Sequence, residues 1–151
     1  MSQALWYGGF HQTADWNMYD HHGFPLWPIQ GTATATAAPD LVNYLLNTGL
    51  AEKIPLDDNF TTNAIPQAQV GDVIAYTWDP TRSNAIDHLA FVVDIAPGQY
   101  PEVSEWGTVP MWEPYQRRGW TWSALHNTWL QDPTLYPDVT AVLIHFTVSS
   151  Y

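Results

Sequence analysis

The side chain best suited to moving a proton in this sequence is that of His88. It follows the polar stretch TRSNAID and directly precedes the apolar run Leu89–Val93. Such a run predicts a buried strand, so we expect His88 at the start of that strand, with its ring facing a cleft. Histidine is the commonest general base because its charge changes near neutral pH. Spacing alone favours a packing histidine over a catalytic one.

Other groups with chemical potential point less clearly to a site. His11, Asp15, Asp20, His21 and His22 carry donors that suit zinc. Adjacent histidines do not readily reach one ion from a strand, and the sequence has no His-Glu-x-x-His pattern. The chain also has no cysteine, which excludes thiolate metal sites and a thiol nucleophile within it. We therefore expect no metal and no cofactor.

Aromatic residues are dense in the second half of the chain. The set comprises Trp106, Trp112, Tyr115, Trp120, Trp122 and Trp129. Aromatic rings stack on sugars, which would suit a glycan ligand, but an aromatic mini-core beneath a long loop is the more common arrangement. Arg117 and Arg118 lie in the same region. They either cap acidic loops or hold a substrate carboxylate through a guanidinium fork, and we favour the structural role.

Composition excludes two classes of partner. The formal net charge is −11, with Lys and Arg together numbering only 4. Binding to nucleic acid requires cations that neutralise phosphates, and attraction to an anionic membrane requires them too, so neither partner is expected. No apolar run approaches the roughly 18 residues of a membrane span, and the N-terminus shows no signal-peptide pattern. The oligomeric state stays open.

The elements that must position these residues form an α+β pattern. Its 151 residues suit a single domain over 1–151. The expected helices cover residues 2–7, the stretch from Pro39 to Gly49, and 121–130; the expected strands cover 72–77, 89–95, 102–106 and 140–148. Residues 10–38 and the stretch from Gly49 to Val70 are expected to be irregular. Helices come first and strands follow, which predicts an antiparallel sheet.

Three motifs of the chain resemble a known family. Residues 2–10, SQALWYGGF, resemble the second half of a helix signature in the putative amidase domain family of the papain-like, NlpC-type cysteine peptidases. That signature reads Asp-Cys-Thr-Asn-Phe-x-Ser-Gln-Ala-Leu and is followed by Gly-Gly. Gly71–Ile74 is similar to the family's Gly-Asp-Val strand, and Asp87–His88 with the following apolar run is similar to its histidine strand. The motifs follow the family's order over essentially the whole chain.

The resemblance implies a papain-like fold, a base and an absent nucleophile. It implies N-terminal helices packed on the antiparallel sheet, with His88 as the catalytic base. The family's cysteine would lie four positions before Met1, so the chain resembles a domain truncated just after its nucleophile. Ser2 would lie one helical turn beyond the thiol position, and we do not expect it to act as a substitute.

The resemblance also suggests a third catalytic residue. In the family, the strand after the histidine strand offers a polar side chain that orients the imidazole. In the simplest alignment Trp106 takes that position, and its indole cannot accept a hydrogen bond. Glu105 is the nearest acceptor and is our candidate, although a shift of one residue reverses the face of a strand. Asp72 is expected to be structural, with its carboxylate accepting backbone N–H groups in a turn.

Two functions of different classes remain open. The first is a cysteine-type amidase or peptidase domain that acts on amide bonds. The resemblance implies cell-wall-like peptide substrates, a bacterial source and a secreted or cell-surface location, and the chain as given would be inactive without the thiol. The second is a non-catalytic module that binds a peptide or glycan in the same cleft. The coding sequence upstream of Met1 would discriminate between them.

Overall fold

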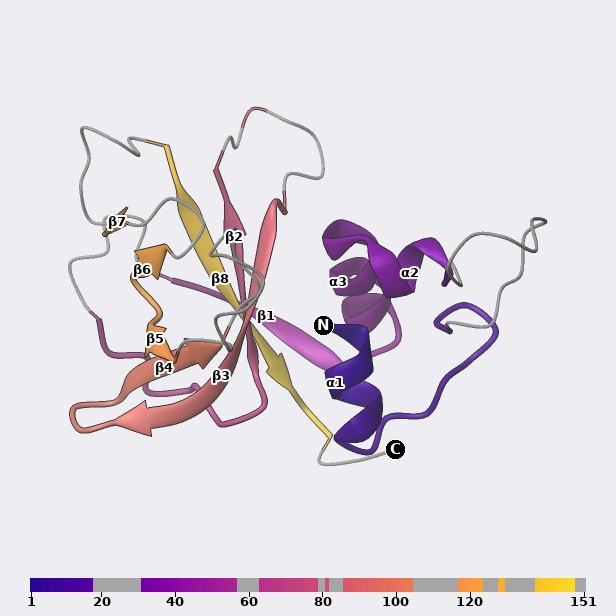
Figure 1. Ribbon diagram of the computed structural model, residues 1–151, viewed down its shortest axis with the longest axis horizontal. Coiled ribbons are helices and arrows are strands. Elements are labelled where there is room, and N and C mark those ends of the chain that lie inside the picture. The colour runs from indigo at the N-terminus through magenta and orange to yellow at the C-terminus, as the bar shows by residue number, and fades with distance from the viewer. Residues whose placement is uncertain are drawn as a thin grey trace, which may run out of the picture. The chain divides into compact units, whose positions relative to one another are not determined.

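The observed architecture is α+β, as the sequence predicts. The computed structural model describes residues 1–17, 31–56, 63–78, 81, 86–104, 117–123, 128–129 and 138–148. Its helices are α1 (Ser2–Tyr7), α2 (Ala33–Thr36) and α3 (Ala38–Asn47). The main sheet contains β1 (Ala51–Pro55), β2 (Val73–Thr77), β3 (His88–Ala96), β4 (Tyr100–Ser104), β5 (Arg118–Gly119) and β8 (Thr140–Phe146), while β6 (Trp122–Ser123) pairs with β7 (Thr128–Trp129) (Figure 1).

The main sheet has the strand order β1-β8-β2-β3-β4-β5. The pairings of β8 with β2, β2 with β3, β3 with β4, and β4 with β5 are antiparallel, which confirms the predicted sheet type. β3 is an interior strand, as its nearly continuous apolar run predicts. Its neighbour β2 is buried at its first four positions. The strands at the centre of the sheet are therefore well packed, which restricts the side chains attached to them.

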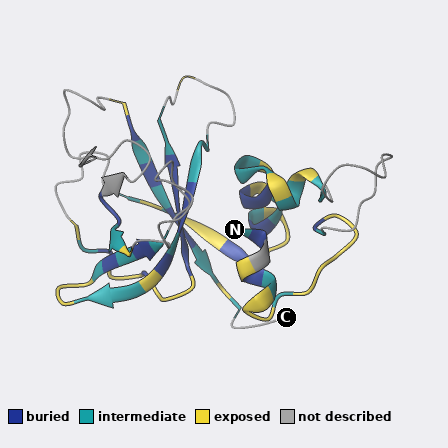
Figure 2. Cartoon of the chain, viewed as in Figure 1, coloured by how far each residue is buried: buried dark blue, intermediate teal, exposed yellow. Residues whose placement is uncertain are grey.

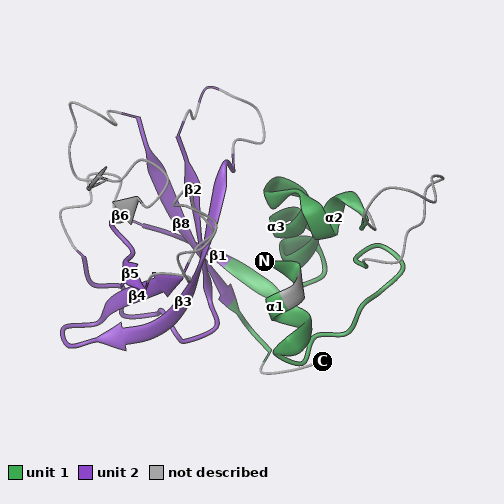
Figure 3. Ribbon diagram, in the orientation of Figure 1, with its two compact units in different colours: residues 1–52, 146–151 green, residues 53–145 purple. Residues whose placement is uncertain are grey.

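The chain divides into two compact units, and each is described by itself. Unit 1 comprises residues 1–52 and 146–151, and unit 2 comprises residues 53–145 (Figure 3). The division falls within β1 and at the last residue of β8. Unit 1 therefore contains the three helices, and unit 2 contains most of the main sheet. The single domain predicted over 1–151 stays a prediction.

In unit 1, α3 forms where the sequence predicts a helix. Pro39 occupies its first turn, where a missing N–H costs nothing, and Asp40 lies near the positive end of the helix dipole. Its buried residues are Leu41, Val42 and Leu45. The chain then turns through Gly49, whose φ of 71° is one that glycine adopts without steric cost. The predicted helix over residues 2–7 is also confirmed, as α1.

Aromatic rings fill the rest of the unit 1 core. Trp16 is only 1% exposed. Its ring centroid lies 5.3 Å from that of Trp6, 6.2 Å from Phe10 and 5.5 Å from Tyr44. Phe10 also contacts Phe146, at a centroid distance of 5.1 Å. Rings of this size bury much apolar area each, so a unit with short helices still gains a core.

In unit 2, strand alternation separates two apolar faces. One face belongs to a hydrophobic cluster formed by Ile65, Ala68, Ile74, Tyr76, Ala90, Val92, Val103, Trp120, Val139, Ala141 and Leu143. Figure 2 shows in dark blue where the buried residues lie along the chain. The opposite face carries the buried residues Val73, Ala75, Leu89 and Ile144. Because both faces of β2 are buried, its sequence is continuously apolar rather than alternating.

Three sequence predictions are wrong. The helix predicted over residues 121–130 is replaced by β6 and β7, which pair antiparallel, and Thr and Trp do favour strands over helices. The stretch from Gly49 to Val70 contains β1, whose Glu, Lys and Pro are poor strand formers but are tolerated at a sheet edge. The stretch 10–38 contains α2, a single turn too short to leave a periodic pattern.

Candidate functional site

The structure places His88 as the first residue of β3, as the sequence predicts. It lies directly opposite Tyr76 of β2 in the antiparallel register. The imidazole and phenol ring centroids are 6.1 Å apart, with the ring planes tilted by 39°. His88 is partly buried, at the point where the chain enters β3. An imidazole in this position is supported by the sheet and still within reach of solvent.

Asp87 fixes the backbone just before His88. Its N–H donates to the carbonyl oxygen of Tyr76 over 2.9 Å. Its carboxylate oxygen Oδ2 accepts a hydrogen bond from the backbone N–H of Trp78, also at 2.9 Å. These two bonds join the start of β3 to the end of β2 from both sides. They set the register that places His88 opposite Tyr76.

Tyr76 is held on two sides in addition to its contact with His88. It is 2% exposed. Its ring stacks on that of Trp78 at a centroid distance of 5.8 Å and an interplanar angle of 8°. Its hydroxyl donates to the carbonyl oxygen of Trp120 over 2.6 Å. Tyr76 therefore contacts both His88 of β3 and Trp120, which lies 44 positions after Tyr76 in the sequence.

We call the segment around Trp120, residues 117–121, the strap. Within it, Trp120 is 1% exposed, and its indole Nε1–H donates to the carbonyl oxygen of Asn63 over 2.7 Å. The Trp120 backbone N–H donates to Pro101 O over 3.1 Å. The hydroxyls of Tyr100 and Thr121 are 3.0 Å apart. Trp120 is thus a core residue, whereas the side chains of Trp106, Trp112, Tyr115, Trp122 and Trp129 lie outside the described part of the chain, so the aromatic mini-core stays a prediction.

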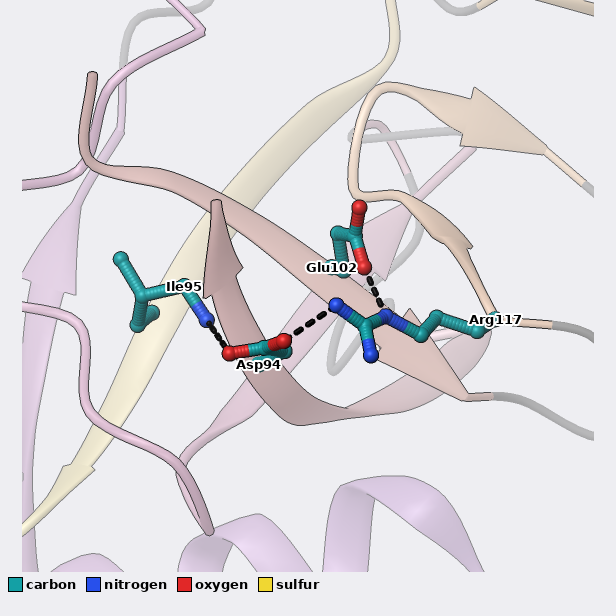
Figure 4. Close-up of polar contacts among 4 residues, drawn as sticks. All are labelled: Asp94, Ile95, Glu102 and Arg117. Carbon is teal, nitrogen blue, oxygen red and sulfur yellow. Dashed lines mark hydrogen bonds and ion pairs between the residues drawn. The ribbon is translucent and has the colours of Figure 1, made fainter. Parts of the chain in front are cut away.

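Arg117 begins the strap and carries out the structural role that the sequence favoured. Its guanidinium bonds to the carboxylates of Asp94 in β3 and Glu102 in β4 (Figure 4). The arginine side chain is 53% exposed, and Asp94 is 46% exposed. Exposed ion pairs contribute little to stability, so the effect of this one is to orient the strap on the sheet. Asp94 Oδ1 also accepts the N–H of Ile95.

A second histidine, His145, is joined to Asp72 on the same face of the sheet. The distance from His145 Nδ1 to Asp72 Oδ2 is 2.8 Å. The same carboxylate oxygen accepts the N–H of Gln69 at 2.8 Å, so the predicted turn-capping role of Asp72 is confirmed. Asp72 is 2% exposed. His145 lies within the strand predicted over 140–148, but its bond to Asp72 is not visible in the sequence because the two residues are far apart in the chain.

In unit 1, the hydroxyl of Ser2 is committed to two structural hydrogen bonds. It donates to the carbonyl oxygen of Ala35 at 2.9 Å and accepts from the indole Nε1–H of Trp16 at 3.0 Å. Ser2 is 2% exposed. Next to it, burial lowers the pKa of the Met1 amino group below its usual value. A hydroxyl used in this way connects α1 to its neighbours and is poorly placed to act as a nucleophile.

Several predicted site residues lie outside the described residues. They are the candidate orienting residue Glu105, the neighbouring Trp106, and Asp20, His21 and His22 of the possible metal set. Within the described ranges, no group of three or more His, Asp or Glu side chains is arranged to hold a metal ion. No helix in those ranges is long and apolar enough to cross a bilayer.

Comparison with known proteins identifies one family. Residues 1–129 match the model of a family described as "Putative amidase domain". Neither the curated proteins nor the solved structures give a match. The matched range includes α1, β2, the His88 strand and the strap.

Proposed function

The chain belongs to the putative amidase domain family, and on this premise we propose that it is built for amide-bond hydrolysis by the thiol mechanism of papain-like, NlpC-type enzymes. Amide hydrolysis at a coarse level follows from the family's description. The finer parts are proposals: the thiol, His88 as base, and peptide substrates of the bacterial cell-wall kind, met outside the cell or at its surface.

The proposed chemistry assigns His88 the proton transfers. Its imidazole accepts the proton of a cysteine thiol, and the thiolate attacks the carbonyl carbon of the amide. The tetrahedral intermediate collapses as the imidazolium gives its proton to the leaving amine. His88 then removes a proton from water, which hydrolyses the thioester and returns the thiol. The thiol is not among the residues of this chain, so we propose that it is supplied by a helical turn preceding Met1.

The observation that carries the proposal is the fixed position of His88. It begins an interior strand, Asp87 before it is bonded to the end of β2, and its ring lies against that of Tyr76. A general base must be held within hydrogen-bond reach of its proton donor. We retain Glu105 as the proposed orienting residue, since it lies one position beyond the last residue of β4, the strand that pairs with the His88 strand.

The experiment restores the nucleophile. The segment Asp-Cys-Thr-Asn-Phe is added before Met1, and alkylation of the thiol by iodoacetamide is followed from pH 5 to pH 9. We expect a thiol that reacts at neutral pH, and His88→Ala slows it by roughly tenfold or more because the imidazolium that favours the thiolate is lost. His11→Ala, at an exposed position, is the matched control. Equal alkylation rates with and without His88 would contradict the assignment.

The absence of any cysteine favours a second candidate for the 151-residue chain itself, a non-catalytic binding module. In this form the chain retains a peptide or glycan without cleaving it. Sedimentation with purified cell-wall material, followed by analysis of the released peptides, tests both parts. Binding without release supports the module. Robust release by the thiol-free chain would refute the proposed chemistry.

A further inference from the structure

Tyr76 occupies the position between the candidate base and the strap. We propose that Tyr76 is a positioning residue for His88, and that it connects the orientation of the imidazole to the seating of residues 117–121. The inference rests on the proposed role of His88 and adds how the orientation of its imidazole is determined. It follows from three contacts of one buried side chain.

The first contact is with the imidazole. Residues directly opposite on antiparallel strands have side chains that touch on the same face, and Tyr76 and His88 are such a pair. The ring centroids are 6.1 Å apart. Tyr76 is 2% exposed and belongs to the hydrophobic cluster of unit 2, so its ring is packed among core side chains. The Tyr76 ring therefore restricts the rotamers open to His88.

The second and third contacts hold the Tyr76 side chain in place. Trp78 stacks on the phenol ring with a plane angle of 8°. The hydroxyl donates to the carbonyl oxygen of Trp120 at 2.6 Å. The stacking on Trp78 sets the plane of the Tyr76 ring, and the hydrogen bond to Trp120 sets the position of its hydroxyl. Together they fix the orientation of the ring that His88 contacts.

The acceptor of the tyrosine hydroxyl lies on the strap. The strap contains β5, which pairs with β4, and it is also held to the rest of unit 2 by the indole and the backbone N–H of Trp120 and by Arg117. A displacement of the strap moves the Trp120 carbonyl oxygen, and the Tyr76 ring must follow or lose its hydrogen bond. The imidazole of His88 then packs against a Tyr76 ring in a different position. Events at the strap thus reach the base through one side chain.

The test compares two tyrosines that bond to the strap. Tyr76→Phe removes the hydroxyl that reaches Trp120, whereas Tyr100→Phe removes the hydroxyl that reaches Thr121. Tyr100 lies opposite Ala96, at the other end of β3 from His88. Carbon–proton correlation spectra of the 151-residue chain report the ring signals of its 6 histidines. His88→Gln assigns the His88 signals. The His145 signals report whether β2 and β8 stay paired.

We expect Tyr76→Phe to shift the His88 ring signals, and Tyr100→Phe to leave them in place, with His145 unchanged in both. Unchanged His88 signals in folded Tyr76→Phe, or equal shifts in both variants, would overturn the inference. Should Tyr76→Phe fail to fold, Trp78→Leu takes its place, since it removes the stacked ring and leaves the hydroxyl bond. Unchanged His88 signals in that variant would overturn the inference as well.

A second readout separates this inference from the proposed function. In the chain extended with Asp-Cys-Thr-Asn-Phe, Tyr76→Phe is expected to slow thiol alkylation at neutral pH by about tenfold, as small misplacements of a catalytic group do. Tyr100→Phe is expected to leave the rate unchanged. If His88→Ala has no effect on alkylation, the proposed function fails, and the ring signals still decide the contact. If His88→Ala slows alkylation and Tyr76→Phe does not, only the positioning role fails.

Discussion

The two ends of β2 each place a histidine against a buried side chain, but they do so with different chemistry. At one end the carboxylate of Asp72 bonds to His145 and to the N–H of Gln69. At the other end the ring of Tyr76 contacts the ring of His88. The Asp72 carboxylate accepts two hydrogen bonds from different parts of the chain and so helps to hold the fold, whereas the Tyr76 ring packs against the His88 ring. The comparison predicts that substitutions at the Asp72 end mainly change stability, and that substitutions at the Tyr76 end mainly change the chemistry proposed for His88.

The largest expected effect is at the carboxylate end. Asp72→Ala leaves the Gln69 N–H and the His145 ring without their acceptor in a site where Asp72 is 2% exposed. We expect a loss of about 3 kcal/mol in the free energy of unfolding, since unsatisfied buried donors are costly. Urea unfolding followed by tryptophan fluorescence measures it. Asp72→Asn keeps an oxygen for Gln69 and should lose less; equal losses in the two variants would contradict this account.

The next effect concerns the strap that supports the aromatic end. A Cβ at Gly119 would lie 1.8 Å from the hydroxyl oxygen and 2.4 Å from Cζ of Tyr100. Gly119→Ala must therefore push the Tyr100 ring away from Thr121, and we expect a loss of about 2 kcal/mol from overpacking. Thermal unfolding measures it. Gly98→Ala has open space around its Cβ but a positive φ, so it reports backbone strain without the clash and serves as the control.

At the aromatic end itself, stability and chemistry should separate. His88→Ala removes a partly buried ring that contacts Tyr76. We expect a loss of about 1 kcal/mol or less, within the range of a single aromatic contact. Urea unfolding alongside Asp72→Ala gives the direct comparison. A loss as large as that of Asp72→Ala would show that both ends of β2 hold the fold, and the distinction between them would disappear.

The smallest effect is at Arg117. Its ion pairs with Asp94 and Glu102 are exposed, so Arg117→Ala should cost under about 1 kcal/mol, with the difference from the unaltered chain shrinking further in about 1 M salt. Unfolding at two salt concentrations measures both values. Lys53→Ala, which removes another exposed base, is the control. A large loss that salt does not change would indicate that the arginine packs rather than pairs.

Local patterns predict the local parts of this fold. The apolar runs of β2, β3 and β8, the Pro39–Asp40 start of α3 and the position of His88 at a strand start are all visible in the sequence. β1 and α2 are missed because one is an edge strand of poor strand formers and the other a single turn. The 121–130 segment is misread because Trp122 and Trp129 at helical spacing also suit two short paired strands.

The contacts that define the candidate site are harder to predict. Tyr76 and Trp120 are 44 positions apart, and Asp72 and His145 are 73 apart. No periodic pattern relates them, because the sheet order that brings them together is a property of the whole chain. Tyr76 reads in the sequence as one more apolar strand residue. Only the register with His88 shows what it touches.

Unit 1 is assembled from two segments far apart in the sequence, 1–52 and 146–151, and this affects how the protein folds during translation. Thr147 donates its backbone N–H to Leu50 O and its hydroxyl to Gly49 O, and Phe146 contacts Phe10. A ribosome releases the helices of unit 1 before any residue of unit 2, and releases Phe146–Val148 only after all of unit 2. The helices must therefore keep an incomplete apolar core while unit 2 is being synthesised. During that interval the nascent chain is exposed to chaperones and to aggregation, and the core of unit 1 is completed only when Phe146–Val148 emerge.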